Sequence, residues 1–450
     1  MTRLTRTLLV ALCYAAGLCA ANAADSSLAA TRAAGTWFEA RSQLRRTGVS
    51  PAFRAGVAAA FDETEEAERQ IGIAARRSDP DLIDSYEALA ELCIREGRYH
   101  SAGAYLYKAV AARHGDAARA EILSHCPDQS VTRQRPSSAR CRRLSDGLFL
   151  AVTANGSAAE YLLDTGSSMS LLRKSEAVRL GLRIRSESLS VTGVSGDRYQ
   201  LPLTTMDTLI VGGVTLHDVT FYVVDDSHFA EPGVLGLNAI VPLGSIRWHA
   251  NGTFESGLEA PTEGRPNLCF DPFTNYMLIR AVVDGRSHTL ILDTGSDDSA
   301  LFPRLASRTD SQVQTRRIYP MSSSFGASTS VPATCAEAVT LVVAGAELGP
   351  RRFPLLLVDP PLWGGTYDGI VGRDPMAQFD DVTLNFRSMS AHLTGFHPQP
   401  QAAGCGLLEL PTRTILQRPE CPPVYDPGPT YECSWVATTG CQVQCIPKKR

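Results

Sequence analysis

The sequence contains the same four-residue motif, Asp-Thr-Gly-Ser, at residues 164–167 and again at residues 293–296. Two apolar residues precede each copy, so a strand ending there would carry an acid out of a core and onto a tight loop. Two carboxylates about 3 Å apart cannot both ionise, and they therefore share one proton. The ionised acid can take a proton from water while the protonated acid donates to a carbonyl oxygen. Asp164 and Asp293 are therefore candidate catalytic residues for acid–base chemistry that needs no metal, no cofactor and no covalent intermediate.

The two Asp-Thr-Gly-Ser motifs belong to a longer internal repeat. An Asn-Gly pair at 155–156 returns 129 positions later as Asp-Gly at 284–285, and both pairs are typical of hairpin turns. Gly-Val-Leu-Gly at 233–236 returns as Gly-Ile-Val-Gly at 369–372. Each copy of the repeat spans about 130 residues and carries one acid in the same place. The sequence thus predicts two similar lobes, each supplying one carboxylate.

This combination of motifs resembles one lobe of an aspartic protease, and it occurs twice between about residues 141 and 396. The short lobes and the Ile-Val-Gly-Arg-Asp run at 370–374 are closer to the retropepsin-like branch than to pepsin. The resemblance implies a mainly β fold with two tandem retropepsin-like lobes that form a pseudo-dimer, preceded by a small all-α domain. It also implies a single-chain aspartic-type endopeptidase whose site lies where the lobes meet.

The other residues of the two Asp-Thr-Gly-Ser motifs are expected to support the active-site loops. By resemblance, the threonines reach across the twofold axis and join the lobes. The glycines let the backbone come close and direct N–H groups at the carboxylates, and the serine hydroxyls are expected to donate to the outer carboxylate oxygens. These supporting residues are Thr165, Gly166, Ser167, Thr294, Gly295 and Ser296.

Two glycine-bearing hairpins are expected to act as flaps over the cleft. The first spans residues 189–201 and contains Gly193 and Gly196; the second spans 321–331 with Gly326 near its tip. An extended peptide could pair its backbone with both hairpins, as in strand addition.

Residues that follow each Asp-Thr-Gly-Ser motif are expected to line pockets beside the scissile bond of the substrate. Most of them are apolar, although they could equally pack the lobe cores. The acids of the second lobe would favour a basic substrate residue if they face the cleft. The residues concerned are Met169, Leu171, Ala300 and Leu301, with Asp297 and Asp298 as the acids.

Length, charge and composition limit the remaining possibilities. The 450 residues leave room for two or three domains, and a net charge of −4 gives no reason to expect nucleic acid or an anionic membrane as partner. The sequence has no phosphate-binding loop, no His-Glu-x-x-His and no Gly-x-Ser-x-Gly motif. The expected partner is a peptide or protein substrate, bound by a monomer.

The N-terminal third is expected to contain an export signal and a helical domain. Residues 1–23 have the charged start, apolar stretch and Ala-x-Ala end of a secretory signal, which predicts a periplasmic or secreted protein, by its Arg-rich usage bacterial. No stretch is long and apolar enough to span a membrane. Residues 24–126 are expected to be helical, and 81–114 resemble one tetratricopeptide repeat. This domain could pack on the protease, bind a protein partner or be a prosegment, and the chemistry is not expected to need it.

The rest of the chain divides by composition. Residues 127–140 are expected to form a linker, 141–258 the first lobe and 266–396 the second. Residues 397–450 are rich in Cys and Pro and are expected to be a loop-rich extension. Of the 12 cysteines, Cys13 and Cys19 lie in the expected signal, and the even number left suggests disulfides. A metal site at Cys433, Cys441 and Cys445 is less favoured, because no nearby His or Cys-x-x-Cys accompanies them.

Two classes of function therefore stay open. One is an exported aspartic endopeptidase. The other is a catalytically silent peptide-binding or scaffold protein with an acid-protease fold. The presence of both Asp-Thr-Gly-Ser motifs favours the endopeptidase, because a binding module has no need of two acids whose repulsion costs stability.

Overall fold

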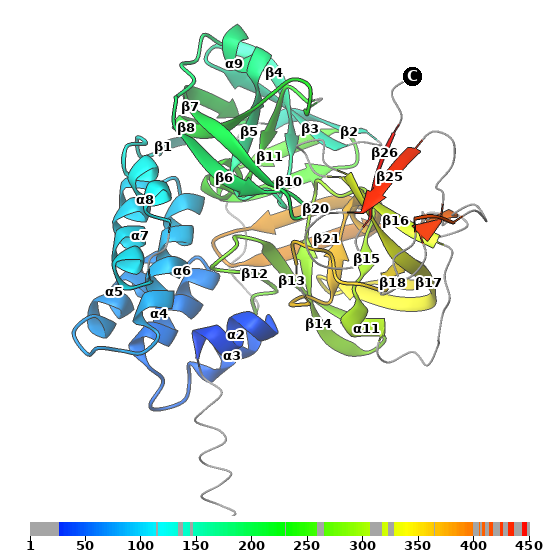
Figure 1. Ribbon diagram of the computed structural model, residues 1–450, viewed down its shortest axis with the longest axis horizontal. Helices are drawn as coiled ribbons and strands as arrows, with labels where there is room; N and C mark the ends of the chain where they lie inside the picture. Colours follow the sequence, from blue (N-terminus) through cyan, green and yellow to red (C-terminus); the bar gives the residue numbers. More distant parts are fainter. Residues whose placement is uncertain are drawn as a thin grey trace, which may run out of the picture.

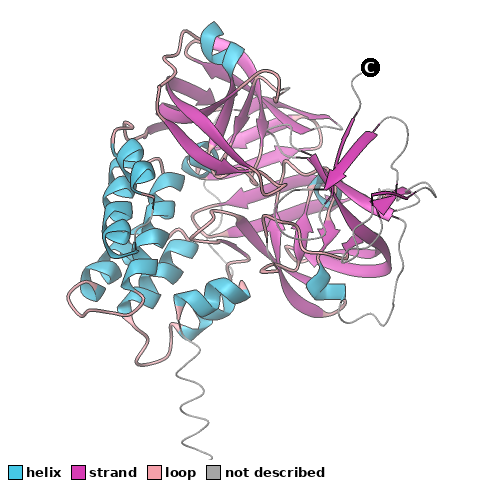
Figure 2. Cartoon of the chain, viewed as in Figure 1, coloured by secondary structure: helices cyan, strands magenta, loops and turns pink. Residues whose placement is uncertain are grey.

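The structure of the chain is a computed structural model. It describes residues 27–113, 116–133, 138–144, 147–229, 231–258, 265–306, 317–322, 328–363, 365–398, 405 and 407–409, and the backbone of four strands between residues 414 and 447. The N-terminal helices lie along one side of the molecule, and strands make up most of the remainder (Figure 1, Figure 2). The expected export signal at residues 1–23 lies outside the described residues.

The N-terminal region is helical, as predicted. Ser27, Ser50 and Asp116 each accept a backbone N–H of the first turn of the helix that follows, which satisfies one of its unpaired donors. Pro51 begins its helix at a position where a missing N–H costs nothing. The helices are α2 (Leu28–Ala34), α3 (Trp37–Gln43), α4 (Pro51–Ala60), α5 (Thr64–Ala74), α6 (Leu82–Arg95), α7 (Tyr99–Arg113) and α8 (Ala117–Ser124).

Helices α6 and α7 form the pair that resembles a tetratricopeptide unit. Gly97, with φ of 73°, lies in the tight turn between them, in the left-handed region that favours glycine. The rings of Tyr86 and Tyr105 stack between the two helices with centroids 6.1 Å apart. The resemblance to one such repeat stays a prediction.

The first repeat forms a twisted sheet in which the strand carrying the acid lies inside. Within the first repeat, neighbouring strands of the sheet follow the order β3-β4-β9-β5-β8-β7-β6, and β3 also pairs with β7. The strands are β3 (Gly147–Ala154), β4 (Ser157–Leu163), β5 (Ser170–Arg173), β6 (Ser188–Thr192), β7 (Arg198–Val211), β8 (Val214–Val224) and β9 (Gly233–Leu235).

The second repeat has the same strand order in a separate sheet. Its path is β13-β14-β19-β15-β18-β17-β16, and β13 also pairs with β17. The predicted mainly β fold is thereby confirmed. The strands are β13 (Met277–Val283), β14 (Arg286–Leu292), β15 (Ala300–Leu301), β16 (Arg317–Ser322), β17 (Ser328–Val343), β18 (Ala346–Leu356) and β19 (Gly369–Val371), with β12 (Leu268–Phe270) at the edge beside β13.

Strands from both repeats meet in one further layer. There β20 of the second repeat pairs with β10 of the first, in the order β21-β20-β10-β11-β2. The boundary between the predicted lobes at residues 258–266 is therefore not a boundary between sheets. These strands are β2 (Ser138–Leu144), β10 (Ser245–His249), β11 (Thr253–Ser256), β20 (Phe379–Asn385) and β21 (Ser390–Phe396).

The segment 127–140, expected to be a linker, is instead partly built into the sheets. Strand β1 (Ser130–Arg133) pairs antiparallel with β8, and β2 pairs with β3 and β11. The turn-forming residue types misled the sequence interpretation, because strand pairing here comes from distant segments that local composition does not reveal.

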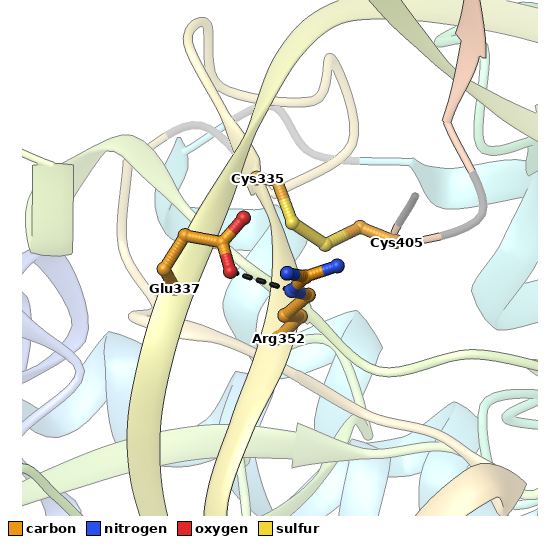
Figure 3. The surroundings of a disulfide bond; sticks show 4 residues. All are labelled: Cys335, Glu337, Arg352 and Cys405. Atoms are coloured by element: carbon orange, nitrogen blue, oxygen red, sulfur yellow. Dashed lines mark hydrogen bonds and ion pairs between the residues drawn. A yellow bond between two sulfur atoms is a disulfide. The ribbon is translucent and has the colours of Figure 1, made fainter. Parts of the chain in front are cut away.

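The C-terminal segment adds strands to the second sheet. Strand β22 (Leu408–Glu409) pairs with β16, and β26 (Val443–Pro447) pairs with β17 and with β25 (Tyr431–Trp435), while β23 (Thr414–Leu416) and β24 (Val424–Tyr425) form a small separate ladder. A disulfide between Cys335 on β17 and Cys405 joins this segment to the sheet, beside the Glu337–Arg352 pair (Figure 3). Part of the segment lies outside the described residues.

Among the cysteines whose side chains the structure describes, the prediction of disulfides is confirmed for one pair, Cys335 and Cys405. Four cysteines that the same argument would have paired are instead buried and form no disulfide: Cys93, Cys126, Cys141 and Cys269. A buried free cysteine behaves as a small apolar residue, so the even count was no guide to their pairing. Cys421 and Cys441 lie outside the described residues, and only the backbone of Cys433 and Cys445 is described. Among the described residues, no helix is long and apolar enough to cross a membrane.

Candidate active site

Asp164 and Asp293 occupy matching places at the ends of β4 and β14. Each of these strands runs parallel to a short later strand, β9 or β19. The backbone N–H of Asp164 donates to the carbonyl of Leu235 at 3.0 Å, and that of Asp293 to the carbonyl of Val371 at 3.0 Å. The sheet ladder therefore continues up to each acid, and the loop begins at the same register in both repeats.

The two acidic loops are joined by reciprocal hydrogen bonds between the threonines. The Thr165 N–H donates to Thr294 Oγ1 at 3.0 Å, and the Thr294 N–H donates to Thr165 Oγ1 at 3.0 Å. The Thr165 hydroxyl then donates to the carbonyl of Leu292, and the Thr294 hydroxyl to that of Leu163, both at 2.8 Å. Both threonines are fully buried. The structure thus brings together the loops that the sequence placed on separate repeats.

The two carboxyl groups lie next to each other at this crossing. A side-chain hydrogen bond joins Asp164 and Asp293. A Cβ atom on Gly166 would lie 2.6 Å from the carboxyl carbon of Asp293, and one on Gly295 would lie 2.6 Å from Asp164 Oδ1. Any side chain at either glycine would displace the facing acid, which explains the residue type at both positions.

Backbone N–H groups of each loop hold the acids in place. Gly166 N donates to Asp164 Oδ1 at 2.9 Å. On the other loop, Gly295 N and Ser296 N donate to Asp293 Oδ1 at 2.8 Å and 3.2 Å. Donors of this kind stabilise the charged form of a carboxyl group.

Burial and mutual repulsion dominate the electrostatics of the pair. Burial raises the pKa of Asp164 well above its usual value, and the neighbouring charge of Asp293 raises it further. Burial also raises the pKa of Asp293, while the hydrogen bond from Asp164 and the loop N–H groups oppose the rise. The two groups titrate together, and the rise in both pKa values favours a state in which the pair holds one proton. This gives one acid and one base in the same place.

The serine hydroxyls do not have the role expected from the sequence. The Ser167 hydroxyl donates to the carbonyl of Met169 at 2.7 Å, and the Ser296 hydroxyl donates to that of Asp298 at 2.9 Å. The expectation that they donate to the outer carboxylate oxygens was therefore wrong. The hydroxyls instead close the loops on themselves, because a carbonyl two residues on is within easier reach.

Behind each acidic loop lie two hydrogen-bonded residues whose role the sequence interpretation missed. In the first repeat, Asn238 Oδ1 accepts from Ser170 N at 2.7 Å and Ser170 Oγ at 2.8 Å. In the second, Asp374 Oδ1 accepts from Ser299 N at 2.7 Å and Ser299 Oγ at 2.6 Å. Each acceptor stands two residues after the last glycine of the repeated Gly-x-x-Gly motif, so a comparison of the repeats could have found them.

The first predicted flap is a hairpin with its tip against the second repeat. Gly193 N donates to the carbonyl of Asp197 across the turn at 2.9 Å, and Gly196 adopts φ of 83°. A Cβ on Gly196 would lie 3.1 Å from Pro361 Cβ, and the adjoining Val194 is buried. The other flap is described only in its strands β16 and β17, and Gly326 lies outside the described residues.

The residues expected to line pockets have different surroundings. Four of them are buried in the lobe cores, so the expectation that they face a cleft was wrong: Met169, Leu171, Ala300 and Leu301. Asp297 pairs with Arg373, which neutralises its charge, whereas Asp298 has no ion-pair partner among the described residues. No group of His, Cys, Asp or Glu in the described part of the chain is arranged to hold a metal ion.

One family of known proteins matches a segment that contains the first acidic loop. Residues 150–239, which include Asp164, match the aspartyl protease family. The crystal structure of a retropepsin-like aspartic protease from Rickettsia conorii matches 29% of this chain and 95% of its own, at 16% identity and a TM-score of 0.22. So low a TM-score carries no argument about the fold of the whole chain. The curated proteins gave no match. The chain thus contains, in residues 150–239, a segment that matches the aspartyl protease family.

Proposed function

We propose that this chain is an aspartic endopeptidase whose two retropepsin-like lobes, fused in one chain as a pseudo-dimer, share a single catalytic site. One observation carries the proposal: Asp164 and Asp293, from matching loops of two repeats, are joined by a hydrogen bond at a buried crossing. The family match over the first repeat supports it. Because both acids come from one chain, a monomer suffices.

The reaction follows from the shared proton. The ionised carboxylate takes a proton from a water molecule, whose oxygen attacks the scissile carbonyl carbon. The protonated carboxyl group donates its proton to the carbonyl oxygen, and a tetrahedral diol forms. The diol collapses as the C–N bond breaks, and a proton passes to the leaving amine. The pair ends with one proton, as it began.

The substrate is an extended peptide held beneath the β6–β7 hairpin. Backbone pairing with a hairpin edge supplies affinity without strong sequence demand. Burial raises the pKa of Asp298 and no described cation pairs with it, so a basic substrate residue, which would stabilise the carboxylate, is favoured on the side of the second repeat. A peptide library in which an acidic residue is preferred there would contradict this assignment.

The proposal is tested by cleavage of a peptide library by the purified protein, with and without a pepstatin-type inhibitor. Asp164→Asn and Asp293→Asn are each expected to abolish cleavage without unfolding the protein, because one acid cannot act as both base and acid. Asp225→Asn, a change at a carboxylate bonded only to nearby Ser227, is the control and retains activity. Peptide binding without cleavage by the wild type would instead support the silent scaffold.

The N-terminal sequence supports export. Residues 1–23 resemble a secretory signal, and the Cys335–Cys405 disulfide is compatible with an oxidising compartment. We expect the mature protein in the periplasm or the medium. Cell fractionation with N-terminal sequencing tests this, and an intact Met1 on protein recovered from the cytoplasm would contradict it.

A further inference from the structure

The helix pair α6–α7 contacts one buried asparagine in each repeat. In the first repeat, Asn238 Nδ2 donates to the hydroxyl oxygen of Tyr99, the first residue of α7, at 3.0 Å. In the second, Asn275 Nδ2 donates to Glu91 of α6, to the backbone carbonyl at 3.1 Å and to the carboxylate at 2.8 Å. All four residues are buried. Polar contacts that are buried on both sides are costly to break, because each leaves groups without a partner.

Tyr99 is linked to the first acidic loop through a short chain of hydrogen bonds. Asn238, which donates to Tyr99, accepts from both polar groups of Ser170, six residues after Asp164. The Ser170 hydroxyl oxygen accepts from Gly236 N at 3.0 Å. Gly236 directly follows Leu235, whose carbonyl accepts the N–H of Asp164. Tyr99 thus supports the Asp164 loop from a fully buried position.

The second repeat has the same support but completes it within the lobe. Its equivalent of Asn238 is Asp374, which accepts from Ser299 in the same way, and Gly372 N donates to the Ser299 hydroxyl at 3.0 Å. The second carboxylate oxygen of Asp374 faces Arg351 of β18 at 3.9 Å. The corresponding atom in the first repeat is the Asn238 amide nitrogen, which donates to the carbonyl of Thr220 on β8 at 2.9 Å and also to Tyr99. In the first lobe the helices therefore add a second contact, from Tyr99, to the one that the lobe supplies itself.

The second contact anchors the same helix pair to the other repeat. Arg95, at the end of α6, is fully buried and donates to Asn275 Oδ1. It also donates to the carbonyl of Ala59 at 2.8 Å and lies over the ring of Phe270, 3.9 Å from its centroid. Helix α6 is therefore held to the second repeat while α7 reaches the first, so one rigid element spans both.

We propose that the helix pair α6–α7 is a permanent part of the catalytic scaffold, with Tyr99 as a positioning residue that acts on the Asp164 loop through Asn238. The proposal rests on the proposed peptidase function. It replaces the expectation that the chemistry does not need the helical region, and it rejects the alternative of a removable prosegment. The helices would then have to stay attached to both lobes in the active protein.

The first test compares kcat and KM of the full-length protein with those of Tyr99→Phe. Loss of the hydroxyl is expected to lower kcat by up to about tenfold, the effect of one buried hydrogen bond, with KM little changed because Tyr99 is fully buried. The matched control is Tyr86→Phe, which keeps the ring that stacks on Tyr105 and removes a hydroxyl on the same helix pair. Equal kcat values for the two variants would overturn the proposal.

A double-mutant cycle tests the route through Asn238. Asn238→Ala is expected to lower kcat more than Tyr99→Phe does, because it also removes the acceptor of Ser170. Adding Tyr99→Phe to Asn238→Ala should then have no further effect. Independent, multiplicative losses in kcat would show that Tyr99 does not act through Asn238.

Amide hydrogen exchange tests the role of Tyr99 separately from the proposed peptidase function. Amide exchange in residues 164–172 is expected to be faster in Tyr99→Phe than in Tyr86→Phe, whether or not the wild type cleaves peptides. Equal exchange rates would overturn the proposal by themselves. A wild type that fails to cleave while the exchange difference appears would overturn only the peptidase function.

Cleavage between Arg133 and Ser138 tests whether the helices can leave. A recognition sequence for a site-specific protease is inserted there in the full chain and cut after folding. The two fragments are expected to elute together on size exclusion and to keep the kcat of the uncut protein. Separation of the helical fragment, or a gain in activity on cutting, would favour the prosegment and overturn the proposal.

Discussion

Asp374 and Asn238 occupy equivalent positions behind the two acids, yet only one of them can titrate. Burial raises the pKa of Asp374 from 3.8 to about 6, against the opposing effect of its hydrogen bonds from Ser299 and the charge of Arg351. The folded state therefore binds a proton at this residue more tightly than the unfolded state does. Its contribution to stability is complete below about pH 4 and is lost as the pH rises through about 6.

Asp374→Asn is accordingly expected to change how stability depends on pH. A rise in pKa from 3.8 to about 6 corresponds to roughly 3 kcal/mol. Relative to the wild type, the variant should gain up to about that amount between pH 4 and pH 7, because its amide cannot ionise. Urea unfolding midpoints across this range measure the gain. Parallel curves for the two proteins would contradict the assignment to this residue.

The threonine contacts between the loops allow a second prediction at this scale. Thr165→Val removes a hydroxyl that donates to the carbonyl of Leu292 and accepts from Thr294 N, and it leaves both groups buried and unpaired. The expected loss is about 3 kcal/mol of unfolding free energy, together with most of the activity.

Thr205→Val is the control for this change. The Thr205 hydroxyl is buried and has no hydrogen-bond partner among the described residues. Its replacement should cost little, because no partner is left unsatisfied. Denaturant unfolding of both variants measures the difference, and a similar loss in each would mean that the hydrogen bonds between the loops add nothing.

Among the elements, the β6–β7 hairpin combines an unusual backbone conformation with a close contact. Gly196→Ala is expected to cost about 1 kcal/mol through the positive φ. It should also raise KM several-fold, because the added methyl group meets Pro361 and displaces the hairpin tip. Gly156→Ala is the control: its φ of 78° is similar, and nothing lies within 4 Å of the added atom. The two variants should lose similar stability, and an equal change in KM would argue against a role of the tip in substrate binding.

The elements of the N-terminal boundary show what decides strand formation in this chain. Residues 127–140 have the composition of a connector, yet strand β1 within them pairs with β8, from Ser130 opposite His217 to Arg133 opposite Val214. Val131 and Thr132 favour a strand, but so short a run forms one only when a free sheet edge lies beside it, because cross-strand pairing supplies most of the stabilisation. The hairpins at 155–156 and 284–285, by contrast, were predictable from their turn residues alone.

At the scale of the whole molecule, the helices and both repeats share one core. Leu28, Trp37 and Phe53 of the helical region belong to the same buried apolar cluster as Leu163 and Leu292, which precede the two acids. Parts that share a core unfold together, because neither keeps its apolar contacts without the other. A single transition is therefore expected, and helix and strand signals should change at the same temperature.

Arg95→Met tests this coupling. The change removes a fully buried cation from Asp62 and from Asn275, and leaves the acid without its partner. Loss of one member of a buried ion pair costs roughly 3 to 5 kcal/mol. Arg69→Met, in an exposed pair with Glu66, should cost less than about 1 kcal/mol. Calorimetry measures both, and a separate helical transition in the wild type would contradict the shared core.

The sequence by itself determined which residues form the central pair and which strands carry them. An apolar pair running into Asp-Thr-Gly is a local pattern, and its recurrence at matched spacing predicted two similar sheets with one acid at the same place in each. This information is local because a strand end and a tight turn depend on neighbouring residues. The catalytic role of the pair is the proposal that the cleavage experiments test.

Only the tertiary structure decided what surrounds the pair. It placed Tyr99 of the helical region behind the Asp164 loop, directed the Ser167 hydroxyl to its own loop, and buried Met169 in a core. It also placed β20 beside β10, so that the lobes share strands that the repeat assigns to different halves. These contacts join residues far apart in the chain. Local spacing cannot specify them, because which distant segment reaches a given surface depends on how all the apolar faces are buried at once.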